Sequence, residues 1–303
     1  MQKIKSISRY VATVSDPFAE VDEWLLKSYR ELDEEGRELL DVHYDANGEI
    51  ESKTVQTYND KGQLVEHITY FSEHEIAEHF QFEYTENGNI VKQIIRYADG
   101  SISIKSFARD KLDLLIEIRD DEDELEGTEF RRFNDQGNLL EEWIKDETGS
   151  ISSRSLHEYN SEGQLVLKTE FGEDDETISK IYYKYDEHGN QIESLTLTEN
   201  NEVKTRRIST FNDQNQLFEE NVDGFKISYE YDESGNRIRD EIIDPHQNTE
   251  SFSEYYYDDN QQLEKTISCQ KGNMAYTSED AVKGGKLAAF LISRYEYEYF
   301  PQE

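Results

Sequence analysis

The segment Tyr58-Asn59-Asp60-Lys61-Gly62-Gln63-Leu64 contains a turn motif that recurs ten times along the 303-residue chain. Each copy begins at an aromatic residue or a leucine, and seven of the nine intervals between copies are 26 residues; the other two are 23 and 20. A fixed period of this kind predicts a repeat architecture. The copies begin at Leu32, Tyr58, Tyr84, Phe107, Phe133, Tyr159, Tyr185, Phe211, Tyr231 and Tyr257.

The copy at Tyr159 continues with Asn160-Ser161-Glu162-Gly163, the pattern of a type I turn closed by a left-handed glycine, which commonly joins antiparallel strands through a bulge. An Asp or Asn at the first position can bond its own turn backbone, and Gly accepts a positive φ without steric cost. Glycine occupies this position in seven copies. Among the exceptions, Asn215 is a tolerable substitute, whereas Lys111 and Gln261 predict altered turns.

Residues 164–171 then read as a strand with Leu165, Leu167, Thr169 and Phe171 on one face. A second turn near Gly172–Glu176 precedes a returning strand, which places Ile181, Tyr183 and Tyr185 on one face and Tyr182 on the other. We therefore expect an all-β fold, an antiparallel β-meander of about twenty strands made of two-strand repeats and twisted or coiled into an elongated or curled sheet. Only the two end strands of such a sheet need protection.

We expect three regions: an N-terminal cap (1–31), the hairpin repeat array (32–274) and a C-terminal cap (275–303). In the first region the repeat phase favours strands over a helix starting at Asp16-Pro17. In the last, the alternating segment 295–299 predicts a strand that stops at Pro301. For residues 286–292 the sequence leaves helix and strand open.

The chain carries 68 acidic and 32 basic residues, for a net charge of −36. Aromatic residues held in register with the repeat indicate a folded chain in spite of this charge. The charge opposes binding to nucleic acid or to an anionic membrane, and favours either a basic protein partner or simply a well-solvated surface. Cys269 is the lone cysteine, so no internal disulfide is expected. No signal-peptide-like or membrane-length apolar run occurs, which makes the cytoplasm the expected location.

No residue pattern predicts catalysis, a cofactor or a metal site. His74 and His79 are five residues apart, in a predicted turn and the strand that follows it. This spacing places their side chains on opposite faces, which opposes a shared zinc site and predicts exposed loop residues. The acidic runs 120–124 and 173–176 lack the ligand spacing of a calcium loop. Cys269 has no activating motif around it. We therefore expect a protein that is not an enzyme.

Two tyrosine clusters allow two interpretations: they pack within the sheet, or they form an exposed platform for a protein partner. Tyrosine suits interfaces because it is rigid, large and partly polar. Consecutive tyrosines in a strand point to both faces, so at least one in each cluster needs a cover or solvent. The candidate partner-binding residues are Tyr182, Tyr183, Tyr185, Tyr255, Tyr256 and Tyr257.

Three segments carry a resemblance to a known family: 44–50 (Tyr-Asp-Ala-Asn-Gly-Glu-Ile), 185–190 (Tyr-Asp-Glu-His-Gly-Asn) and 231–236 (Tyr-Asp-Glu-Ser-Gly-Asn). Over residues 24–274 the chain resembles the YD-repeat, or rearrangement-hotspot (RHS), proteins. The resemblance implies a spiralling β-sheet, which in long members forms a shell around a toxic polypeptide. This chain is much shorter, and its Asp244-Pro245 lies inside the array, so a small relative that binds a partner on its sheet is expected.

These observations predict a non-enzymatic protein-binding repeat module, of the immunity or antitoxin type, that neutralises a basic toxin domain. The alternative is a structural scaffold or shell fragment of an RHS-like toxin or secretion system that self-assembles through its end strands. The sequence leaves the oligomeric state open.

Overall fold

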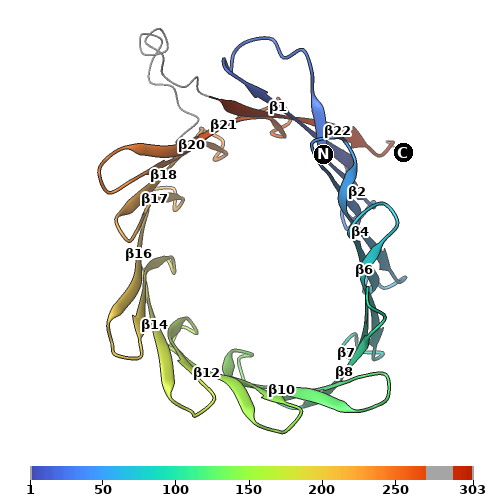
Figure 1. Cartoon of the computed structure of the whole chain (residues 1–303). Coiled ribbons are helices and arrows are strands. Elements are labelled where there is room, and N and C mark those ends of the chain that lie inside the picture. The colour runs from blue at the N-terminus through green and yellow to red at the C-terminus, as the bar shows by residue number, and fades with distance from the viewer. Residues whose placement is uncertain (1, 271–288, 302–303) are drawn as a thin grey trace. The chain divides into compact units, whose positions relative to one another are not determined.

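The computed structural model describes residues 2–270 and 289–301, which form 22 β-strands and no helix (Figure 1). The chain forms two compact units: unit 1 comprises Met1–Gln56, Tyr70–Glu75 and Thr210–Glu303, and unit 2 comprises Thr57–Thr69 and Ile76–Ser209. The predicted all-β antiparallel meander is confirmed, because every strand pairing that the structure describes is antiparallel.

Unit 1 contains the strands from the two ends of the sequence. They are β1 (Ile4–Val14), β2 (Leu25–Leu32), β3 (Glu38–Tyr44), most of β4 (Ile50–Tyr58), β17 (Leu217–Val222), β18 (Phe225–Tyr231), β19 (Arg237–Ile243), β20 (Thr249–Tyr257), β21 (Leu263–Gln270) and β22 (Phe290–Tyr299). Strands, not a helix, therefore flank Asp16-Pro17, as the repeat phase predicted. The predicted strand 295–299 lies within β22. Of the undecided segment 286–292, residues 290–292 also lie in β22 and are therefore strand, while 286–288 lie outside the described residues.

Unit 2 contains the central strands of the meander. They are β5 (Leu64–Tyr70), β6 (Ile76–Tyr84), β7 (Ile90–Tyr97), β8 (Ile102–Asp110), β9 (Asp113–Arg119), β10 (Leu125–Phe133), β11 (Leu139–Asp146), β12 (Ile151–Tyr159), β13 (Leu165–Phe171), β14 (Thr177–Tyr185), β15 (Gln191–Thr198) and most of β16 (Val203–Phe211).

The turn after Tyr159 shows how the motif produces a hairpin. Gly163 has a φ of +81°, and its N–H donates to the carbonyl oxygen of Asn160 at 3.1 Å. The Asn160 side-chain oxygen accepts from the N–H groups of Glu162 and Gln164 at 3.0 and 2.9 Å. The pairing register shifts between Glu158 and Tyr159, which marks the expected bulge. The predicted turn geometry is confirmed.

The two turns that lack a glycine or asparagine behave differently from each other. Lys111 lies in a two-residue turn that joins β8 to β9, so an altered turn is confirmed there. At Gln261 the prediction of an altered turn was wrong: the residue adopts a φ of +64° and donates to the Asp258 carbonyl at 3.0 Å, as a glycine would. The surrounding turn bonds fix the left-handed conformation although glutamine disfavours it.

Short turns also explain the two irregular intervals of the repeat. β8 extends three residues beyond Phe107 before its two-residue turn, so the aromatic of the 23-residue interval lies inside a strand. In the 20-residue interval, from Phe211 to Tyr231, the two residues Asp223 and Gly224 replace the longer second turn, between β17 and β18.

The expectation that the first and last strands are sheet edges was wrong. β1 pairs with β2 on one side and with β22 on the other, in a ladder from Ile4↔Tyr299 to Val14↔Phe290. β22 also pairs with β21, so Pro301 follows an interior strand. The two ends of the meander are therefore hydrogen-bonded to each other within unit 1.

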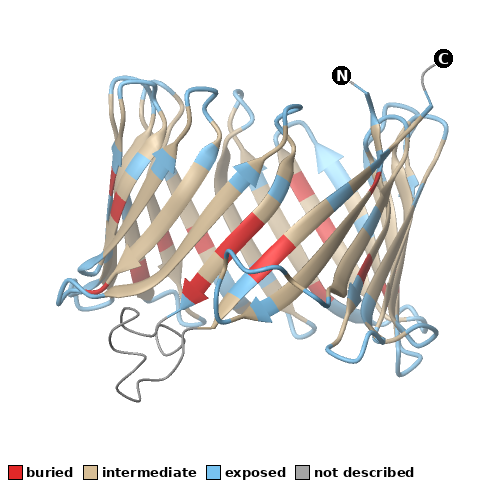
Figure 2. Ribbon diagram, turned by 90° about the horizontal axis from the view of Figure 1, so that it is seen from above, coloured by how far each residue is buried: buried red, intermediate tan, exposed pale blue. Residues whose placement is uncertain are grey.

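Each unit buries few side chains, because its strands contact their ladder neighbours and no second sheet. Most strand residues are only half-buried, as the tan ribbon of Figure 2 shows. The buried apolar side chains lie mainly in β21 and β22 (Ile267, Cys269, Ile292) and in β7 and β9 (Ile95, Leu114, Ile116). No helix within residues 2–270 or 289–301 is long and apolar enough to cross a membrane.

Replacement of a turn glycine tests the left-handed requirement without a steric complication. Gly137 has a φ of +84°, and a Cβ there would meet nothing within 4 Å. Gly137→Ala is expected to lower the free energy of unfolding by about 1 kcal/mol because L-residues disfavour this conformation. Gln261→Gly should raise it, by about 0.5 kcal/mol. Urea unfolding of both variants measures the effect; a loss at both positions would contradict this explanation.

Candidate functional site

The aromatic residue that opens the motif ties each hairpin to the one before it. In unit 2 the hydroxyls of Tyr84, Tyr159 and Tyr185 donate to the carbonyl oxygens of Leu64, Leu139 and Leu165, at 2.6, 2.8 and 2.8 Å. Each acceptor lies twenty residues upstream of its donor. These tyrosines therefore stabilise the stacking of successive repeats.

The same bond recurs in unit 1. The hydroxyls of Tyr231, Tyr257 and Tyr297 donate at 2.8 to 2.9 Å to carbonyl oxygens of a preceding strand. Tyr297 lies in β22, beyond the last motif copy. Its hydroxyl nevertheless donates to the Leu263 carbonyl oxygen, as the hydroxyl of a repeat tyrosine does. The last strand thus continues the repeat.

Two of the six predicted partner-binding tyrosines therefore have a structural role, since Tyr185 and Tyr257 make this bond. Tyr182 and Tyr256 point to the opposite face of their strands, and each is 38% exposed. They lie in different units, so the structure does not place them in one site. Both stay candidates for contact with a partner.

Tyr183 lies on a polar face in unit 2, next to two buried serines that bond to half-exposed carboxylates. The hydroxyl of Ser179 donates to Glu170 at 2.5 Å, and Ser155 donates to Glu142 at 3.0 Å. A hydrogen bond from the Lys168 ammonium, 2.8 Å away, is the largest of the effects that hold the pKa of Glu170 below its usual value. Paired groups of this kind can lie in a sheet without leaving a charge unsatisfied.

His157 lies on the same polar face and is the one group there with an unsatisfied atom. Its Nδ1 is buried and has no hydrogen-bond partner, a condition it shares with Arg294 Nε among the described side chains. Burial lowers the pKa of His157, so the neutral ring is favoured at neutral pH. The nearest charges are those of Glu142, Lys168 and Glu170, all part of the pairs already formed.

In unit 1 the tyrosines form a second polar network. Tyr229 donates to Glu220 at 2.9 Å and Tyr255 donates to Asp240 at 2.7 Å. The Arg237 guanidinium lies over both rings, 5.6 and 4.9 Å from their centroids. Burial, with the Glu220 carboxylate, raises the pKa of Tyr229 to about 12. The raised pKa values of Tyr229 and Tyr255 keep both hydroxyls protonated as donors.

The sequence interpretation included Tyr255 but missed Tyr229, Glu220 and Asp240. A signal was present, because Tyr229 and Tyr255 are 26 residues apart and so occupy the same phase of the repeat. Their carboxylate partners could not be found in this way, since Glu220 lies nine residues before its tyrosine and Asp240 fifteen before its own.

The described residues contain no group of three or more side chains arranged to hold a metal ion. His79 bonds to Glu66 at 2.8 Å, while His74 is exposed in the preceding turn. In the acidic run 120–124 the Asp120 carboxylate accepts from backbone N–H groups of its own turn. In the run 173–176, Asp175 pairs with Arg154 at 2.8 Å.

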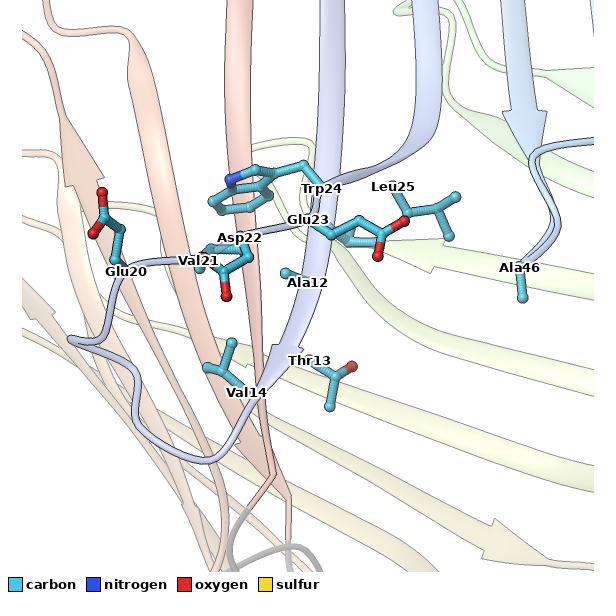
Figure 3. A pocket seen from close by; sticks show the side chains of 11 residues that line it. Ala12, Thr13, Val14, Glu20, Val21, Asp22, Glu23, Trp24, Leu25 and Ala46 are labelled. Atoms are coloured by element: carbon cyan, nitrogen blue, oxygen red, sulfur yellow. The ribbon is translucent and has the colours of Figure 1, made fainter.

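A cavity of about 560 Å³ lies in unit 1 between the end of β1 and the connection to β2. Figure 3 shows Val14, Glu20, Asp22 and Trp24 around it. The connection itself is held to the sheet, because Arg294 lies 4.8 Å from the Trp24 ring centroid. None of the predicted site residues lines this cavity.

Comparison with known proteins gives only weak similarities to solved structures. No family model matches the chain, and no curated protein matches it. A chain of the Photorhabdus luminescens Tc holotoxin pore, carrying a TccC3 mutation, is 15% identical with a TM-score of 0.39, over 81% of this chain and 15% of that one. The TcdB2–TccC3 structure is 13% identical with a TM-score of 0.27, over 83% and 20%. A porin-like protein from Bacteroides uniformis is 10% identical with a TM-score of 0.33, over 97% and 98%.

This chain therefore spans less than a quarter of each toxin chain to which it is similar.

Removal of a repeat hydroxyl tests the inter-repeat bond. Tyr159→Phe is expected to lower the free energy of unfolding by about 1 kcal/mol, because the Leu139 carbonyl loses its hydroxyl donor. Tyr182→Phe is the matched control: its ring is exposed and the structure gives its hydroxyl no partner. Chemical unfolding curves compare the two. Equal effects would show that the bond to Leu139 adds nothing.

The Tyr229 network predicts a pH dependence in the alkaline range. The pKa of Tyr229 is raised from 10.0 to about 12 in the folded protein. Its contribution to stability is therefore complete below pH 10, and is lost as the pH rises through about 12. In a pH titration followed by tyrosinate absorbance, Tyr229→Phe should show one fewer late-titrating tyrosine than the native protein. An unchanged titration curve would contradict the assignment.

Proposed function

We propose that the protein is a non-enzymatic binding module that holds a basic protein, in the manner of an immunity protein or antitoxin that neutralises a basic toxin domain. The observation that carries the proposal is the charge excess on a thinly buried sheet. With 68 carboxylates and 32 cationic side chains, 36 carboxylates are left without a cation of this chain to neutralise them. Such a surface attracts a basic protein at long range and repels phosphate backbones.

The internal ion pairs support this interpretation. In many of the ion pairs one basic side chain is shared by two carboxylates. Arg154, for example, pairs with Glu141 at 3.0 Å and with Asp175 at 2.8 Å. These shared positive side chains are thus already neutralised within the sheet. The exposed acidic turns, by contrast, remain available to a partner.

The scaffold alternative loses its proposed mechanism of assembly. Self-assembly through the end strands needs a free edge, but β1 and β22 pair with each other and have a second neighbour each. No other observation favours a shell fragment. The YD-repeat resemblance supports the proposal through the motif turns and the tyrosine bonds, both of which the structure contains.

Affinity capture from the native host tests the proposal. The immobilised protein should retain a basic protein at about 0.1 M salt and release it at about 1 M, where the screening length falls from about 10 Å to about 3 Å. An unrelated acidic protein of similar net charge is the control bait. Failure to enrich any basic protein over that control, at any ionic strength, would contradict the proposal.

A further inference from the structure

Negative charge in unit 2 is concentrated at one end of its strands. The antiparallel order places every second turn at the same end. The five turns at what we call the acidic end contain thirteen carboxylates and no basic residue; they are 98–101, 120–124, 147–150, 172–176 and 199–202. The six turns at the opposite, motif end contain six carboxylates and two lysines; they are 59–63, 85–89, 111–112, 134–138, 160–164 and 186–190.

Exposed apolar side chains are concentrated at the same end. Strands that leave the acidic turns begin with Leu125, Val203 and, one residue further in, Ile178, which are 36%, 63% and 47% exposed. Ile144, near the end of an entering strand, is 44% exposed. At the motif end, the exposed large apolar residues next to the turns are Ile90 and Leu112. Exposed apolar side chains beside carboxylates that have no partner are typical of an interaction surface.

Several of these carboxylates do not serve the fold. Asp120 is an exception, because its carboxylate accepts backbone N–H groups of its own turn. Asp121, Glu122, Glu173 and Asp174 are exposed, and the structure gives their side chains no hydrogen-bond or ion-pair partner. They carry charge that internal structure does not use.

We propose that the acidic end of unit 2 docks a lysine- or arginine-rich segment that also carries apolar side chains. This inference rests on the proposed function and names the surface that performs it. Successive acidic turns are two strands apart, about 10 Å, which is close to the length of one three-residue turn of polyproline II, about 9 Å. In a segment with that conformation a basic residue at every third position lies on one side and would meet one acidic turn after another, and the apolar residues between would lie beside Leu125, Ile178 and Val203.

Peptide binding to charge-matched variants tests the surface. The probe is a labelled peptide of six Lys-Val-Thr units, with six Lys-Ser-Thr units as a probe of equal charge. The acidic-end variant is Asp121→Asn/Glu122→Gln/Glu173→Gln/Asp174→Asn, and the motif-end control is Glu86→Gln/Asp135→Asn/Glu162→Gln/Glu187→Gln. Both variants lose four charges, so an effect of net charge alone would be equal in the two.

We expect the acidic-end variant to weaken binding of the Lys-Val-Thr peptide by about fivefold or more in fluorescence anisotropy, and the control by less than about twofold. Ile178→Thr/Val203→Thr should weaken it by about threefold, while Ile90→Thr/Leu112→Thr at the motif end should not. The Lys-Ser-Thr peptide should bind the native protein more weakly. Circular dichroism and thermal melts confirm that each variant is folded.

Equal loss in the two charge variants, or equal binding of the two peptides, would overturn the docking surface. Host capture separates this failure from that of the proposed function. A basic partner retained equally by the acidic-end variant would overturn the surface and leave the function standing. If the native protein captures no basic partner, the function fails, and the peptide results alone decide whether the surface binds basic apolar segments.

Discussion

The structure depends on main-chain hydrogen bonding between neighbouring strands, because each unit has no second sheet against which to bury a large core. A sheet of this kind must pair its N–H and C=O groups sideways and must leave no strand with a free edge. The pairing of β1 with β22 meets the second requirement in unit 1. Tyrosine hydroxyls such as those of Tyr159 and Tyr231 add side-chain bonds from one repeat to the next.

The turn chemistry explains how a chain with so much negative charge reaches this state. The carboxylates of Asp186 and Asp232 accept N–H groups of their own turns, and side-chain bonds from Asn190 and Asn236 are the largest of the effects that lower the pKa of each. The ionised form is thereby favoured where the fold needs an acceptor. Other carboxylates, such as Asp121 and Asp174, have no such use. The first group serves the fold, and the second supports the proposal of a basic partner.

Much of the fold could be predicted from the sequence because the repeat is local: an Asp or Asn, a left-handed residue three positions on and alternating strands suffice. The pairing of β1 with β22 could not, since nothing in a local motif specifies which strand the last one meets. The prediction of an altered turn at Gln261 was wrong because residue preference alone does not include the hydrogen bonds of the surrounding turn. Of the predicted tyrosines, Tyr185 and Tyr257 have structural roles that periodicity alone did not distinguish from binding, whereas the exposed Tyr182 and Tyr256 remain open to a partner.

Hydrogen exchange of the β1 amides, residues 4–14, tests the central claim most directly. If main-chain pairing with both β2 and β22 holds the ends of the meander together, these amides should exchange as slowly as those of the interior strand β12, residues 151–159. Exchange of alternate β1 amides at the rate of the exposed turns would show a free edge and would contradict the account.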